Sequence, residues 1–151
     1  MAEISRVIGV SPEKVFEVLA DGWTYPLWVV GATHMRDVDP DWPAVGARIH
    51  HSVGVWPLML EDDTEVVEME IDRRLVLRAR AWPTGTARVR IALSAVDGGT
   101  RVTMTEFVES GPGRLLPGFV EGIGLRFRNA ESLARLGRIA ENRNRQVTNP
   151  R

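Results

Sequence analysis

Alternating apolar and polar residues predict a series of β-strands through most of the first two thirds of the chain. The predicted strands cover residues 3–10, 34–38, 46–55, 59–71, 75–82, 86–96 and 100–109. From residue 34 onward, only short segments rich in Gly, Pro and Asp separate these strands, and such segments are typical of turns. Because short turns join consecutive strands, the pattern indicates an antiparallel meander.

Apolar residues at helical spacing predict three helical segments. The first begins at Pro12, with Ser11 as an N-cap whose side chain accepts an amide hydrogen bond, and it ends near Gly22. Residues 23–29 are aromatic and apolar and predict a single helical turn. Residues 115–142 predict one long helix, because apolar residues recur every three or four positions. We expect a frayed, basic tail at 144–151.

Composition favours a single globular domain, which we place at residues 1–143. The chain has 151 residues, of which 44% are hydrophobic and 26% charged, and its net charge is −1. This charge argues against a nucleic-acid partner. The absence of cysteine excludes disulfides and cysteine-ligated zinc. The chain shows neither a signal peptide nor an apolar run of the ~18–20 residues that a membrane span needs, so we expect a cytoplasmic protein without stable membrane insertion.

The order of the elements, together with several short motifs, resembles a known fold. The motifs are Ile-Gly-Val-Ser-Pro-Glu-Lys-Val-Phe at 8–16, Asp-Gly-Trp-Thr-Tyr-Pro-Leu-Trp at 21–28, Gly-Ala-Arg at 46–48 and Gly-Gly-Thr-Arg-Val at 98–102. They resemble the START-like (SRPBCC) superfamily, in particular its polyketide cyclase/dehydratase branch. The resemblance implies an α+β helix-grip fold. In that fold, a curved antiparallel sheet of about six to seven strands wraps around a long C-terminal helix, and two short helices follow the first strand.

The resemblance also implies a cavity between sheet and helix that holds an apolar or aromatic small molecule. Combined with the two-residue period of each strand, it predicts which side chains face that cavity. The predicted ligand-binding residues are Trp28, Ile49, His51, Val53, Trp56, Leu77, Ala79, Trp82, Val89, Ile91, Met104, Glu106, Phe119, Ile123 and Phe127. The superfamily shares no catalytic signature, so it assigns no catalytic residue here.

Two titratable residues, His51 and Glu106, fall on the predicted inner face and are the candidates for catalysis. A buried carboxylate must be paired, protonated or hydrated. Glu106 could therefore anchor a ligand, act as an acid or base, or form a salt bridge at a strand end. If it is unpaired, Glu106→Gln should stabilise the empty protein, whereas the loss of a salt bridge should destabilise it. His51 has the same alternatives, and His50 is predicted to face outward.

Other notable residues favour structural interpretations. The acidic run Glu61-Asp62-Asp63-Thr64-Glu65 lacks the spacing of a calcium loop, so we expect it to face the outer arginines and to hold no metal. We expect no cofactor. Four tryptophans, Trp28, Trp42, Trp56 and Trp82, fall at element ends, where they could rim a cavity or cap the core. We expect Trp23 to be packed.

Glycines recur at the start of the predicted long helix. Gly118, Gly122 and Gly124 weaken a helix by up to ~1 kcal/mol each relative to Ala. They predict either a flexible gate over the cavity or a helix that begins only after Gly124.

Three functions fit these patterns. The leading hypothesis is a protein, monomeric or homodimeric, that binds a hydrophobic small molecule such as a lipid. The second is a polyketide cyclase/dehydratase-type enzyme in which His51 or Glu106 moves protons. The third is a protein-interaction module without a ligand, which would use the basic helix residues Arg126, Arg128, Arg135 and Arg138.

Overall fold

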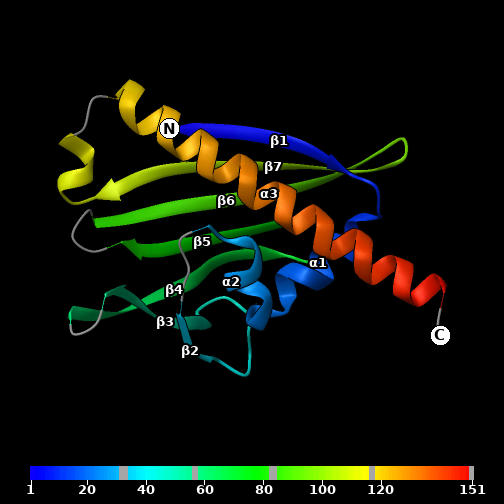
Figure 1. Ribbon diagram of the computed structural model, residues 1–151, viewed down its shortest axis with the longest axis horizontal. Helices are drawn as coiled ribbons and strands as arrows, with labels where there is room; N and C mark the ends of the chain where they lie inside the picture. The colour runs from blue at the N-terminus through cyan, green and yellow to red at the C-terminus, as the bar shows by residue number, and fades with distance from the viewer. Residues whose placement is uncertain (31–33, 56–57, 82–84, 116–117, 150–151) are drawn as a thin grey trace.

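A seven-stranded antiparallel sheet organises the residues that the computed structural model describes, which are 1–30, 34–55, 58–81, 85–115 and 118–149. Its spatial order is β1-β7-β6-β5-β4-β3-β2, with β1 and β2 at the two edges (Figure 1). The strands are β1 (Ala2–Ile8), β2 (His34–Val38), β3 (Arg48–Val55), β4 (Leu58–Glu70), β5 (Arg74–Ala81), β6 (Gly85–Val96) and β7 (Gly99–Ser110). The predicted meander is confirmed, since β2 to β7 pair in chain order.

Helices cover one face of this sheet, as expected for a helix-grip fold. They are α1 (Pro12–Ala20), η1 (Gly22–Thr24), α2 (Tyr25–Trp28), η2 (Pro112–Leu115) and α3 (Gly118–Thr148). The long helix α3 crosses the sheet diagonally, from β1 to α1, and contacts β1, β7, α1 and α2 (Figure 1). The predicted α+β fold is therefore confirmed. We call the face toward α3 the inner face of the sheet.

Both ends of α3 differ from the sequence prediction. The helix begins at Gly118, close to the predicted residue 115, so the alternative start after Gly124 is wrong; it also includes the segment predicted to fray as far as Thr148. A tertiary contact supports this longer end: the Arg143 guanidinium donates a hydrogen bond to Asp21 Oδ2 at 2.9 Å. Periodicity missed it because the last turns carry few apolar residues.

The start of α1 is also capped differently from the prediction. Ser11 stands at the N-cap position and Pro12 opens the helix, but the Ser11 side chain makes no capping hydrogen bond. Instead, the Ser11 carbonyl accepts hydrogen bonds from the amides of Lys14 and Val15.

The hydrophobic core lies beneath the second half of α3. There Leu133 and Leu136 are fully buried, together with Ile8 of β1, Val15 of α1 and Ile91 of β6. Side chains of this kind stabilise a fold by ~1.5–3 kcal/mol each when fully buried. One turn before Leu133, α3 carries a buried polar residue, Asn129, instead of an apolar one.

The described tryptophans divide between core and surface. Trp42 is buried, and its indole Nε1–H donates a hydrogen bond of 3.1 Å to the Leu19 carbonyl, so it caps the core. Trp28 is also buried, with 3% exposure. The prediction that Trp23 packs is wrong, because it is 58% exposed. Trp56 and Trp82 lie outside the described residues.

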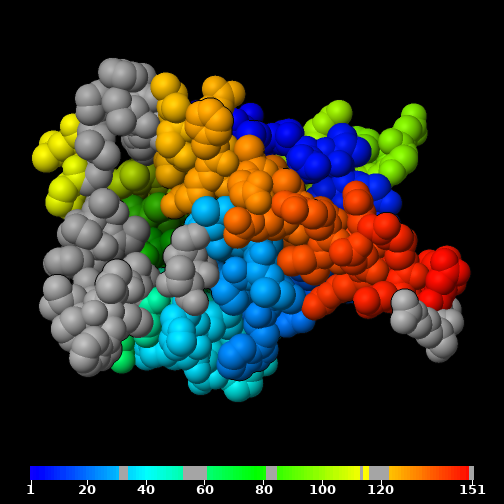
Figure 2. All heavy atoms as spheres, viewed as in Figure 1, coloured from blue at the N-terminus to red at the C-terminus, as the bar shows by residue number. Residues whose placement is uncertain are grey.

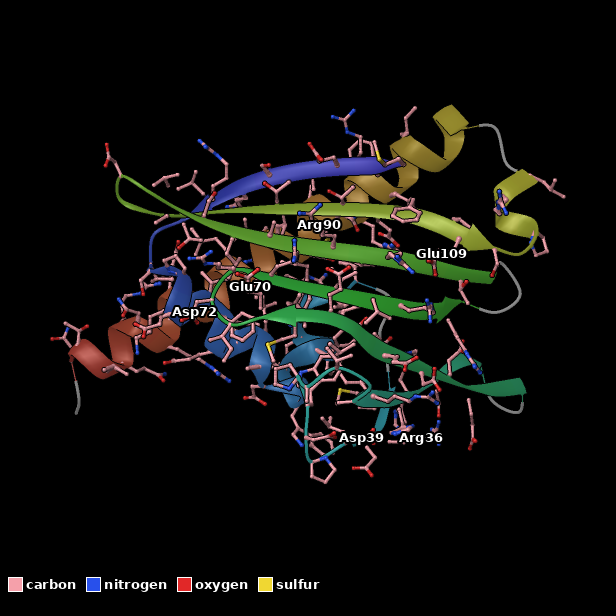
Figure 3. All side chains as sticks on the ribbon, turned by 180° about the vertical axis from the view of Figure 1, so that it is seen from behind. Arg36, Asp39, Glu70, Asp72, Arg90 and Glu109 are labelled. Carbon is pink, nitrogen blue, oxygen red and sulfur yellow. The ribbon has the colours of Figure 1, made fainter. Side chains whose placement is uncertain are left out.

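Ion pairs organise the outer face of the sheet, which helices leave uncovered (Figure 3). Glu109 of β7 pairs with Arg88 at 2.6 Å and with Arg78 at 3.1 Å. Asp63, in the acidic run, pairs with Arg48 and Arg80. These contacts confirm the predicted position of Asp63 opposite outer arginines. Among the described residues, no cluster of acidic, His or Cys side chains could hold a metal, and no helix is long and apolar enough to cross a membrane.

Two glycines offer a test of this packing. A Cβ on Gly22 would lie 2.7 Å from Val38 Cγ1 and 3.2 Å from the buried Trp42 ring. We expect Gly22→Ala to destabilise the protein by about 1–3 kcal/mol, the usual cost of overpacking. Gly124→Ala is the matched control, because a Cβ there meets nothing within 4 Å and α3 continues past it. The free energy of unfolding of Gly124→Ala should be up to ~1 kcal/mol higher than that of the parent.

Urea denaturation of both variants measures the difference. A Gly22→Ala protein as stable as the parent would contradict the close packing of η1 on Trp42. The structure describes the backbone of Gly118 and Gly122 but not their side-chain surroundings. The flexible gate over the cavity therefore stays a prediction.

Candidate functional site

His51 lies on the inner face of the sheet, as predicted, in a small polar network. It is 6% exposed, and its Nε2 lies 3.1 Å from the Thr64 hydroxyl on the neighbouring strand β4. The Tyr25 hydroxyl of α2 contacts the same Thr64 oxygen at 3.5 Å. The Tyr25 and His51 rings stack, with centroids 6.5 Å apart. The network therefore joins β3, β4 and α2.

Local sequence explains why α2 supplies the tyrosine. Pro26 suits the first turn of this short helix, where its missing N–H leaves no partner unpaired. Tyr25 and Trp28 are three positions apart and thus share the face toward the sheet, where their rings meet edge to face at 5.5 Å. Leu27, on the opposite face, is 61% exposed.

Glu106 is the second titratable residue that was predicted on the inner face, and Arg128 of α3 pairs with it. Glu106 is 4% exposed and lies in mid-strand, in register with Val89 of β6 and Ala2 of β1. Its predicted inward position is confirmed. The pairing corrects two details of the prediction. The salt bridge forms in mid-strand rather than at a strand end, and the half-exposed Arg128 pairs with a buried carboxylate of the sheet rather than belonging only to a solvent-facing basic surface.

Three buried polar atoms of this region have no hydrogen-bond partner in the described part of the chain: His51 Nδ1, Glu106 Oε2 and Asn129 Nδ2. An unsatisfied buried polar group costs ~1–3 kcal/mol. Native proteins carry few such groups, and they concentrate where a ligand, an ion or water completes the bonding.

Burial keeps the ring groups of the network uncharged at neutral pH. Desolvation lowers the pKa of His51 below 6.5, and the nearby Asp62 carboxylate opposes this only in part. Burial likewise raises the pKa of Tyr25 above 10, and the Glu106 carboxylate raises it further, while the Thr64 hydrogen bond and Arg128 act in the other direction. Tyr25 is thus a neutral hydroxyl, and His51 a neutral imidazole.

The other predicted site residues fall into three groups. Ile49, Leu77, Ile91, Met104 and Trp28 are buried in the core, while Ala79 and Val89 are half-buried beside the polar network. Ile123 and Phe127 are 57% and 77% exposed and line a surface groove with Ile4. Trp56 and Trp82, and the side chains of Val53 and Phe119, lie outside the described part of the structure.

Sequence reasoning missed Tyr25, Thr64, Arg128 and Asn129. Tyr25 carried one usable signal, since it is the single tyrosine of the chain. Thr64 belongs to the acidic run 61–65, which the sequence analysis assigned to the outer face. Arg128 and Asn129 could not be placed, because the orientation of α3 over the sheet decides which of its polar residues turn inward.

The match to a family model agrees with this geometry and defines the class of protein. Residues 2–141 match the family described as polyketide cyclase/dehydrase and lipid transport. The chain therefore belongs to this family, and the predicted membership in the START-like superfamily is confirmed.

Solved structures share the same fold. A protein of Mesorhizobium loti aligns with a TM-score of 0.69 at 20% identity, over 93% of this chain and 96% of that one. Ara h 8.0201 aligns with a TM-score of 0.66 at 13% identity, over 93% and 96%. DynU16, a protein in the dynemicin biosynthetic locus, aligns with a TM-score of 0.63 at 22% identity, over 93% of this chain and 46% of its own. No curated protein matches the sequence.

The lowered pKa of His51 generates a pH prediction. The folded state binds a proton on His51 less readily than the unfolded state does. The contribution of His51 to the free energy of unfolding is therefore fully present above pH ~6.5, and it is lost as the pH falls below that value. We expect His51→Gln, which retains a polar amide, to lose less stability than the parent between pH 7 and pH 5. The slopes of the free energy of unfolding against pH should differ between the two proteins by at most ~1.4 kcal/mol per pH unit.

Urea titrations at several pH values test this expectation. His34→Gln is the control, because His34 is exposed on β2. An unchanged slope in the His51 variant would mean that this imidazole is not buried in its neutral form.

The Glu106–Arg128 pair predicts the stability of a second variant. Glu106→Gln should destabilise the protein at pH 7 by about 1–2 kcal/mol, because it removes a hydrogen bond between charged groups and leaves Arg128 unpaired. The double variant Glu106→Gln/Arg128→Met should lose less free energy of unfolding than the two single variants lose in sum. Glu109→Gln, on the solvent-facing side, is the matched control. If Glu106→Gln equals or exceeds the parent in urea, the carboxylate is not held by Arg128.

Proposed function

We propose that this protein binds a hydrophobic or aromatic small molecule between the inner face of the sheet and the first half of α3. The observation that carries the proposal is a set of inward polar groups: Tyr25 joins His51 through Thr64, the Glu106 carboxylate acts electrostatically on Tyr25, and buried polar atoms of His51 and Glu106 lack partners among the described residues. Ligand sites are typically apolar surfaces with a few convergent polar groups that orient the molecule.

The strands around the cluster offer such apolar walls. Leu77 pairs with Val89 across β5 and β6, and in the next inward row Ala79 pairs with Ala87. The two alanines are flanked by Thr64 on β4. These side chains are short, whereas the row at Ile91 belongs to the buried core together with Leu133 and Leu136 of α3.

The family supports the same proposal, because its description includes lipid transport. In this proposal, residues 1–143 form one ligand-binding domain. The protein works in the cytoplasm as a monomer or homodimer, and it needs neither a cofactor nor nucleic acid.

Acid–base catalysis is the second candidate, and the stacked pair of neutral Tyr25 and His51 favours it. A neutral imidazole can accept a proton from a carbon next to a carbonyl, and a neutral phenol can donate a hydrogen bond to that carbonyl oxygen. The family description names polyketide cyclases and dehydrases, and DynU16 is a protein of a biosynthetic locus. Deuterium uptake at the activated carbon of a bound β-diketone, lost in His51→Gln, would distinguish catalysis from binding alone.

A matched pair of alanine substitutions tests the binding proposal. Ala79→Phe fills the inner face, whereas Ala92→Phe places the same ring on the outer face of β6. The probe is N-phenyl-1-naphthylamine, which is neutral and fluoresces in apolar surroundings. We expect saturable binding to the parent with a shift of Trp emission, at least tenfold weaker binding to Ala79→Phe, and unchanged binding to Ala92→Phe.

Circular dichroism must first show that both variants are folded. Native mass spectrometry of freshly purified protein provides a second readout, namely a retained small molecule. Equal affinity of the parent and folded Ala79→Phe would contradict the proposed site.

A further inference from the structure

A surface groove runs between the edge strand β1 and the first half of α3, on the other side of the helix from Asn129. Its volume is about 310 Å³, and it is lined by Ile4, Ile123, Arg126, Phe127 and Ala130. Figure 2 shows the orange atoms of this part of α3 directly beside the blue atoms of β1. We call it the edge groove. Its volume is at the lower end of the ~300–1,000 Å³ found for small-molecule sites.

The walls of the edge groove are apolar and unusually exposed. Ile123, Phe127 and Ala130 are four and three positions apart and thus share one face of α3, opposite Ile4 of β1. Phe127 is 77% exposed and Ile123 is 57% exposed. Contiguous exposed apolar side chains of this kind mark binding sites more often than scattered ones do.

Arg126 is the single charged residue among the described residues that line the edge groove. It has no ion pair or hydrogen bond with any described residue, whereas other arginines of α3 are engaged: Arg128 with Glu106, and Arg135 and Arg138 with Glu131. A guanidinium has five N–H donors, and it binds a carboxylate with two parallel hydrogen bonds. The edge groove thus offers an apolar surface and, at its rim, a cation that no described residue pairs with.

We propose that the edge groove is a second binding site, separate from the interior one, for a small amphipathic carboxylate such as a medium-chain fatty acid. The apolar chain lies on Ile4, Ile123, Phe127 and Ala130, and the carboxylate pairs with Arg126. A small molecule fits better than a membrane surface, because the groove is concave and its floor, Ile4, is partly buried on the inner face of β1.

The test compares decanoate with decanol, both below the concentration at which they aggregate, on protein with labelled Ile and Ala methyl groups. We expect decanoate to shift the methyl signals of Ile4, Ile123 and Ala130 in a saturable way, and decanol to bind at least about tenfold more weakly. Arg126→Gln should lower the affinity for decanoate about tenfold, which is the loss expected for one charge-assisted hydrogen bond. Arg145→Gln, exposed near the end of the same helix, is the matched control and should have no effect.

Four results would overturn the inference. Equal affinity for decanol and decanoate, or equal effects of the two arginine variants, would remove the role of Arg126. Loss of decanoate binding in Ala79→Phe would place the acid in the interior, which would support the proposed function and reject the edge groove. Methyl shifts that appear only with phosphatidylglycerol vesicles, and not with decanoate, would identify a membrane-contact surface instead.

Discussion

One charged contact joins the first half of the long helix to the sheet: the pairing of Glu106 on β7 with Arg128 on α3. A buried carboxylate is costly unless a cation or hydrogen bonds compensate it. Arg128 supplies that compensation from the helix. The rotation of α3 that buries Leu133 and Leu136 also brings Arg128 and Asn129 over the sheet. The apolar core and the polar cluster are therefore two consequences of one helix orientation.

The same orientation divides the inner face into a closed half and a polar half. Beneath Leu133 and Leu136, large side chains such as Ile91 and Leu75 fill the space. Toward the other half, the sheet presents Ala79, Ala87, Thr64 and His51, and the helix presents polar residues. Burial there keeps Tyr25 and His51 neutral, as the directions of their pKa shifts indicate. Neutral donors and acceptors in apolar surroundings suit a ligand that is mainly hydrophobic.

The first turns of α3 present different chemistry on two sides. Arg128 and Asn129 turn inward, while Ile123, Arg126 and Phe127 face the edge strand β1 and solvent. An edge strand leaves the adjacent helix face without a further strand to pack on. The edge groove follows from this topology, since β1 ends the sheet on that side. Two nearby arginines of one helix thus differ: Arg128 pairs with Glu106, whereas Arg126 pairs with no residue in the described part of the chain.

The sequence alone determined the strands, the meander, the long helix and the inward positions of His51 and Glu106, because each depends on local periodicity and turn residues. It also carried the motif order that indicated the family. Only the tertiary structure decided the partners. Arg128 meets Glu106, Tyr25 meets His51 through Thr64, and Ile123 and Phe127 lie in a surface groove instead of facing the polar cluster. Such contacts join elements far apart in the chain, and they depend on the rotation of α3 and the docking of α2, which no local pattern encodes.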